Sequence, residues 1–171
     1  MSTETDIPPR HTIAVLVDNE PGVLARVVGL FSGRGYNIES LTVAEVDATL
    51  DRSRINIVTC GDDMIINQIR AQLERLVPVF NVVDLTDEGP SVERELALIK
   101  VVAHGDDRIE ALRVADIFRA RAVDSTLGSF VFEVTGDSNK VNAFIDLMRP
   151  LGLAEVSRTG VVAIARGADA M

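Results

Sequence analysis

One stretch of this sequence, from Asn19 to Leu24, has residue types and a spacing that could bind a small anion. An apolar run ends before Asn19, and apolar residues of helical period follow Gly22. The first N–H groups of such a helix, here those of Gly22, Val23 and Leu24, lack partners within the helix and favour a carboxylate. Gly22 has no Cβ to obstruct a ligand, and the Asn19 amide can donate or accept hydrogen bonds. An ordinary helix start capped by Asp18 or Asn19 explains the same residues, so both interpretations stay open.

Other residues that could carry chemistry are few and scattered. The two histidines, His11 and His104, have no cysteine or acidic pair at the spacing of a metal site. We therefore expect both to be solvated loop residues, and we expect no metal. No serine lies in a G-x-S-x-G turn, and the local sequence brings no serine, histidine and aspartate together. The sequence thus predicts no catalytic residues and offers no support for a stand-alone enzyme.

Two acidic pairs and one glycine-rich stretch are explained by helix ends. Asp62-Asp63 and Asp106-Asp107 each follow a glycine and precede a helical pattern, so helix capping and the helix dipole account for them. The glycines within Gly29–Gly35 come at the end of a predicted helix, whereas a phosphate-binding loop places its glycines before one. We therefore expect no nucleotide site.

The composition is that of an acidic globular protein. Hydrophobic residues make up 47% and charged residues 25% of the 171 positions, and the net charge of -9 disfavours nucleic acid. The start, MSTETDIPPR, lacks the pattern of a signal peptide, and no apolar run approaches the roughly 20 residues of a membrane helix. We expect the single cysteine, Cys60, to be buried as a small apolar side chain. These features predict a cytoplasmic protein.

Apolar periodicity predicts two units with the same order of elements, β-α-β-β-α-β. In the first unit, the predicted strands are Thr12–Asp18, Tyr36–Val46, Arg54–Cys60 and Val79–Leu85, with helices following Pro21 and Gly61. In the second unit, the predicted strands are Leu96–Ala103, Ala122–Thr126, Phe130–Val134 and one or two within Leu153–Arg166, with helices following Gly105 and Gly136. This order is typical of the ferredoxin-like fold, so the predicted class is α+β.

The segment Asp87–Ser91, DEGPS, is the best candidate for a linker. We therefore divide the chain into a flexible tail at 1–11, a first domain at 12–86, a linker at 87–93 and a second domain at 94–171. Each unit would leave a sheet face or edge uncovered, and pairing of sheets between two chains would cover it. A homodimer is the expected result.

The residues from Asp18 to Val43, DNEPGVLARVVGLFSGRGYNIESLTV, closely resemble the start of the small, regulatory subunit of acetohydroxyacid synthase, also called acetolactate synthase. A strand, then N-x-P/S-G-x-L, then a helix is similar to an ACT domain, and Gly29–Val43 is far more specific to this family. Two later segments also resemble the family: IFRARAVD (Ile117–Asp124) is similar to the helix and strand of its second domain, and SRTGVVAIARG (Ser157–Gly167) to its C-terminal ending. The resemblance runs from Thr12 to Gly167.

The resemblance implies an ACT domain of βαββαβ type, a second ferredoxin-like domain and dimerisation through the ACT domains. It implies a chain without an active site that associates with the large catalytic subunit, raises its activity and confers feedback inhibition by valine, sometimes by leucine or isoleucine. The catalytic partner is expected to use thiamine diphosphate, Mg²⁺ and FAD in branched-chain amino acid biosynthesis. The alternative is an ACT-type amino-acid sensor that regulates a different metabolic or transcriptional partner.

The effector site of the family lies between two ACT domains, and its motif can be carried over by position. Asn19 and Gly22 match the loop that contacts the amino acid, Val23 and Leu24 match the helix start, and Asn37 and Ile38 match the residues from the neighbouring chain. Backbone N–H groups would bind the carboxylate of the amino acid, and oxygens of Asn19 or Asn37 would bind its ammonium group. A recess near Val23 and Ile38 would hold its side chain. Many relatives have Ala and Ser where this chain has Val23 and Ala25, and they often carry Pro near Glu45-Val46. The bulkier Val23 would narrow the recess.

Overall fold

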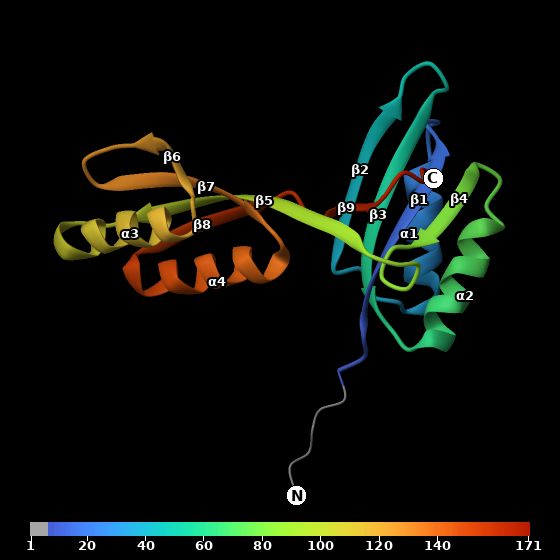
Figure 1. Cartoon of the computed structure of the whole chain (residues 1–171), viewed down its shortest axis with the longest axis horizontal. Helices are drawn as coiled ribbons and strands as arrows, with labels where there is room; N and C mark the ends of the chain where they lie inside the picture. Colours follow the sequence, from blue (N-terminus) through green and yellow to red (C-terminus); the bar gives the residue numbers. More distant parts are fainter. Residues whose placement is uncertain (1–6) are drawn as a thin grey trace, which may run out of the picture. The chain divides into compact units, whose positions relative to one another are not determined.

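The structure is a computed structural model that describes residues 7–171, and the chain divides into two compact units (Figure 1). The first unit comprises the described residues up to Val92 together with Ala163–Met171, and the second comprises Glu93–Val162. This division differs from the predicted domains, because the last residues of the chain return to the first unit. Residues 1–6 of the predicted tail lie outside the described residues, and Arg10 and His11 belong to the first strand.

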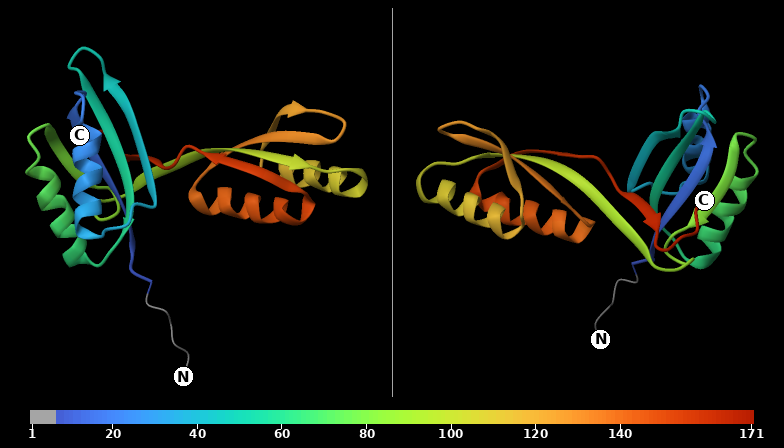
Figure 2. Two further views of the ribbon diagram at one scale, coloured as in Figure 1. Left: turned by 180° about the vertical axis from the view of Figure 1, so that it is seen from behind. Right: turned by 45° about the horizontal axis from the view of Figure 1, so that its top comes forward.

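The first unit has the predicted order of elements. They are β1 (Arg10–Asp18), α1 (Val23–Arg34), β2 (Ser40–Asp47), β3 (Arg52–Cys60), α2 (Asp63–Glu74) and β4 (Val79–Asp84). The strands form an antiparallel sheet in the order β2-β3-β1-β4, and both helices lie on one face of it (Figures 1 and 2). Alternate residues of β3, such as Ile55 and Ile57, are fully buried in a core that includes Val27 and Phe31 of α1. Each such side chain contributes about 1.5–3 kcal/mol by burial, which holds the helices on this face.

The second unit repeats the pattern. Its elements are β5 (Ser91–Val102), α3 (Gly105–Ile117), β6 (Arg121–Ser125), β7 (Ser129–Gly136), α4 (Ser138–Met148), a 3₁₀ turn (Arg149–Leu151) and β8 (Leu153–Arg158). A further strand, β9 (Val162–Ala165), lies almost entirely in the segment that returns to the first unit. The sheet order is β6-β7-β5-β8, and β9 also pairs with β5. Ile99, Phe132 and Phe144 lie in its core. The predicted α+β class with two ferredoxin-like units is confirmed. No helix in residues 7–171 is long and apolar enough to span a membrane.

The helix starts confirm one predicted cap and correct two others. The Asp62 carboxylate accepts a hydrogen bond from the Ile65 N–H at 2.8 Å, which caps α2 as predicted. Asp106 and Asp107 lie in the first turn of α3, where they complement the helix dipole without capping it. Neither Asp18 nor Asn19 caps α1, because the helix begins only at Val23 and its cap position has no side chain.

Candidate functional site

The loop that leads from β1 into α1 is held by hydrogen bonds to two other turns. The N–H of Asp18 donates to the carbonyl of Pro78 at 2.9 Å, and the N–H of Asn19 donates to the carbonyl of Asp51 at 2.7 Å. Gly22 then occupies the cap position with φ 87°, a backbone conformation that residues with a Cβ rarely adopt. The start of α1 therefore lies beside the turn that follows β2.

Within the described residues, the start of α1 presents unpartnered N–H groups at Gly22 and Leu24, two of the three that the sequence predicted, and also at Ala25. The Val23 N–H makes a long hydrogen bond of 3.4 Å to the Glu20 carbonyl. Within residues 7–171, the N–H groups of Leu24 and Ala25 have no hydrogen-bond partner. The Val23 side chain is buried in the core, whereas Leu24 is 38% exposed. Two adjacent N–H donors at the positive end of a helix dipole suit a carboxylate.

The other two predicted site residues lie at the far end of the same helix. Asn37 and Ile38 follow Gly35, the C-terminal cap of α1. A helix of 12 residues extends about 18 Å, at 1.5 Å per residue. One chain therefore brings Asn19, Gly22, Val23 and Leu24 together but does not bring them to Asn37 and Ile38. The expectation that Asn37 and Ile38 contribute to the site from a neighbouring chain stays a prediction.

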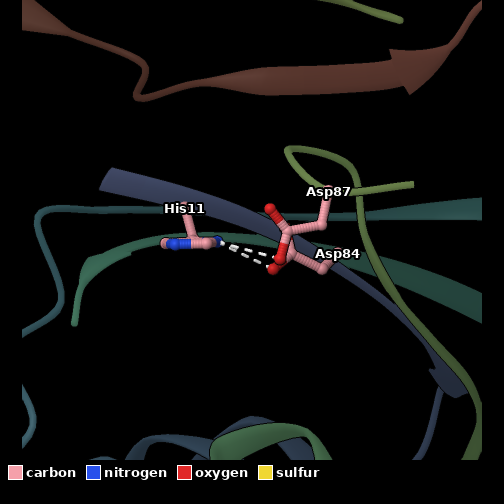
Figure 3. A group of neighbouring side chains, drawn as sticks. All are labelled: His11, Asp84 and Asp87. Atoms are coloured by element: carbon pink, nitrogen blue, oxygen red, sulfur yellow. Dashed lines mark hydrogen bonds and ion pairs between the residues drawn. The ribbon is translucent and has the colours of Figure 1, made fainter. Parts of the chain in front are cut away.

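His11 is not the solvated loop residue that the sequence predicted. It lies in β1 with its side chain 4% exposed, and its Nδ1 is 2.8 Å from Oδ2 of the fully buried Asp84 and 4.0 Å from Oδ2 of Asp87 (Figure 3). The sequence could not show this, because His11 and Asp84 are 73 residues apart and only the pairing of β1 with β4 brings them together. One histidine and two aspartates are ligand types of a divalent metal site.

The contacts of this group are those of a buried hydrogen-bonded pair. His11 and Asp84 lie at hydrogen-bond distance from each other, and Oδ1 of Asp84 accepts the Thr86 N–H at 3.0 Å. The two buried side chains thus satisfy one another, as buried polar groups must. The pair links β1 to the end of β4 and to the turn that follows.

The burial of Cys60 also differs from the prediction that it is a buried apolar side chain. It is half-exposed, because it ends β3 on the face opposite Ile55 and Ile57, and its Sγ donates a hydrogen bond to Oε1 of Glu39 at 3.0 Å. The hydrogen bond to Glu39 and partial burial raise the pKa of the Cys60 thiol. A raised pKa favours the neutral thiol over the nucleophilic thiolate.

The second unit has a shallow hollow of about 180 Å³ on its sheet, and this hollow holds no free charge. It is lined by Leu98, Lys100, Val131, Glu155 and Ser157. The Lys100 ammonium lies 2.6 Å from Oε2 of Glu155, so the two charged groups of the hollow neutralise each other. Among the described residues, the start of α1 is thus the better candidate for binding a charged small molecule.

Comparison with known proteins shows the family. Two family models match the chain, the "AHAS small subunit-like ACT domain" at residues 13–81 and the "Small subunit of acetolactate synthase" at residues 94–167. The chain is 54% identical over 158 residues to the probable acetolactate synthase small subunit of Archaeoglobus fulgidus, covering 92% of this chain and 98% of that protein. The chain belongs to the acetolactate synthase small-subunit family.

Other members of the family agree with this assignment. The acetolactate synthase small subunit of Aquifex aeolicus is 49% identical over 158 residues, covering 92% of this chain and 81% of that protein. The crystal structure of the acetolactate synthase small subunit from Thermotoga maritima matches with a TM-score of 0.84 at 40% identity, covering 94% of this chain and 99% of that chain. The family and the ACT domain inferred from the sequence are confirmed.

Proposed function

We propose that this chain is a non-catalytic regulatory subunit that activates the large subunit of acetolactate synthase and makes it sensitive to valine. The observation that carries the proposal is the exposed start of α1 in a member of this family, with the N–H groups of Leu24 and Ala25 unpartnered. These N–H groups would bind the carboxylate of valine, and the exposed Asn19 side chain would contact its ammonium. Gly22 leaves the approach open, since no heavy atom lies within 4 Å of the position that a Cβ would take.

The arrangement of β2 supports a site shared between two chains. β2 is an edge strand, and its Val43 and Val46 are 40% and 55% exposed. Asn37 and Ile38 precede the start of β2, whereas the start of α1 lies beside the turn that follows its end. Antiparallel pairing of two β2 strands about a twofold axis would place the start of one beside the end of the other. Asn37 and Ile38 of one chain would then lie near Gly22 and Leu24 of its partner.

Valine would regulate the activity of the large subunit if it binds more tightly to one conformation of the complex than to another. A coupling of about 1–3 kcal/mol changes an affinity by roughly 5–150-fold, which suffices for feedback inhibition. The catalytic chemistry, with thiamine diphosphate, Mg²⁺ and FAD, would belong to the large subunit. Such a complex would serve branched-chain amino acid biosynthesis and sense one of its products.

The test is an assay of acetolactate formation by the matching large subunit, with those three cofactors, with and without this chain and across a titration of valine. We expect the chain to raise the rate and valine to lower it again. Parallel titrations with leucine and isoleucine identify the preferred effector. An unchanged rate and an absent valine response would contradict the proposal, as would pyruvate turnover by this chain alone.

A further inference from the structure

The segment that carries Asn37 has few backbone restraints of its own. Residues 36–39 lie between α1 and β2 and belong to neither. The Tyr36 N–H donates to the Phe31 carbonyl at 3.0 Å, and the Glu39 N–H donates to the Val58 carbonyl at 2.8 Å. These two bonds hold the ends of the segment, but neither involves the peptide group that joins Asn37 to Ile38.

A buried hydroxyl group restrains that peptide. Oγ1 of Thr59, on β3, donates a hydrogen bond to the Asn37 carbonyl at 2.6 Å. Thr59 is 0% exposed, so water cannot replace its partner, and a β-branched side chain has few rotamers by which to turn away. The hydrogen bond therefore sets the orientation of the Asn37–Ile38 peptide plane.

The Asn37 side chain depends on this restraint. Asn37 is exposed, and its side-chain amide has no hydrogen-bond partner among residues 7–171. The direction in which the Asn37 side chain extends is therefore set by the backbone of Asn37. When a protein group is already held in its binding orientation, ligand binding costs no free energy for ordering it. When the group is mobile, that cost is subtracted from the binding free energy.

We propose that Thr59 is a positioning residue for the effector site, which holds the Asn37–Ile38 peptide so that Asn37 can contact an amino acid bound at the α1 start of the partner chain. This inference rests on the proposed function and adds to it a residue that is buried and touches no ligand. Thr59 lies on β3, far in the sequence from the motif at Asn19–Leu24, so the motif gives no indication of its role.

The test replaces Thr59 in the complex with the large subunit and follows the valine response. Thr59→Val keeps the shape of the side chain and removes the hydroxyl. We expect the valine concentration for half-inhibition to rise about fivefold, in line with the loss of one hydrogen bond, while the activation measured without valine stays unchanged. Thr59→Ser retains the hydroxyl and should restore the wild-type midpoint. Thr59→Ala, which also lacks the hydroxyl, should show the same rise as Thr59→Val.

The matched control is Thr86→Val. It removes a different threonine hydroxyl of the same unit, one that accepts the Thr12 N–H at 2.9 Å, and should leave the valine midpoint unchanged. An unshifted midpoint in both Thr59→Val and Thr59→Ala overturns the inference. An equal shift in Thr86→Val, or parallel loss of activation, also overturns it, because either result shows general loosening of the unit. A wild-type complex that ignores valine overturns the proposed function itself, and the inference with it.

Discussion

At position 22, the backbone conformation and the proposed ligand both favour a residue without a Cβ. The positive φ favours glycine, and the absence of a Cβ leaves the two free N–H groups accessible. The carboxylate of an amino acid and the side chain of an acidic residue would compete for the same donors. Substitutions at position 22 can therefore distinguish a ligand-binding site from an ordinary helix start.

Gly22→Asp is expected to abolish the response to valine. Its carboxylate would lie by the start of α1, accept the free N–H groups and repel the carboxylate of the ligand. Gly22→Ala is the control, because it introduces the same backbone strain of about 1–3 kcal/mol without a charge. Valine titrations of the complex measure both variants. Normal inhibition in Gly22→Asp would rule out this loop as the effector site.

Asn37→Ala is expected to weaken valine binding without unfolding the chain. The side chain is exposed and forms no hydrogen bond within the described chain, so we expect the free energy of unfolding to change by less than about 0.5 kcal/mol. Titration calorimetry with valine and thermal unfolding measure the two effects separately. An unchanged affinity would remove Asn37 from the site.

Cys60 provides a test of local electrostatics. Because the hydrogen bond to Glu39 raises the pKa of the thiol, less thiolate is present at a given pH, and alkylation is slow. Glu39→Ala removes that bond and the negative charge, so the pKa should fall and iodoacetamide should react faster at pH 8. Mass spectrometry follows the modification, and Glu88→Ala, an exposed substitution elsewhere in the unit, should leave the rate unchanged. An equal rate in Glu39→Ala and wild type would contradict this assignment.

At the scale of elements, β2 has the features of a pairing edge. Among the strands of residues 7–171 it pairs with β3 alone, and Val43 and Val46 expose apolar surface. Unpaired strand edges are sites at which chains associate. β2 therefore connects the two halves of the proposed effector site, which lie at its opposite ends.

Val43→Glu is expected to abolish the proposed dimer and to leave monomers. Two like charges would be brought together at the symmetric edge and would lose water on pairing. Val77→Glu is the control, since Val77 is 95% exposed and lies outside the strands. Size-exclusion chromatography with light scattering measures the mass. A Val43→Glu chain that remains dimeric would exclude β2 as the interface.

At the scale of the whole molecule, the chain enters the second unit once and returns to the first. Hydrogen bonds hold the returning segment to other residues of the first unit. Nη2 of Arg54 donates to the Ala163 carbonyl at 2.8 Å, and the Arg166 N–H donates to the Pro90 carbonyl at 2.9 Å. Burial lowers the pKa of Arg54, yet the carbonyl of Ala163 and the side chain of Asn56 give its guanidinium hydrogen-bond partners.

Arg54→Met is expected to loosen this returning segment. Methionine retains the apolar length of the side chain but cannot donate to the Ala163 carbonyl. Amide hydrogen exchange of residues 163–166 should become faster, while exchange in the second unit is unchanged. Arg113→Met, which removes an exposed i,i+3 pair with Glu110, is the control and should alter neither. Unchanged exchange at residues 163–166 would show that Arg54 does not hold the segment.

The sequence determined the features that depend on local patterns. The order of elements and the cap at Asp62 follow from periodicity and from glycine, proline and aspartate at helix starts. The family follows from a continuous motif, Asp18–Val43, whose residues need no folding to be recognised. Asn19, Gly22, Val23 and Leu24 are neighbours in the sequence, so the structure necessarily keeps them together.

The tertiary structure decided everything that depends on contacts between distant residues. His11 is buried because β4 brings Asp84 to it, Cys60 is half-exposed because of its place on β3, and Thr59 restrains Asn37 across 22 residues. The cap position of α1 is Gly22 rather than Asp18 or Asn19, and hydrogen bonds to Pro78 and Asp51 hold the preceding loop. Periodicity reports which face of an element is apolar, but strand pairing decides which side chains meet, and pairing joins segments that the sequence keeps far apart.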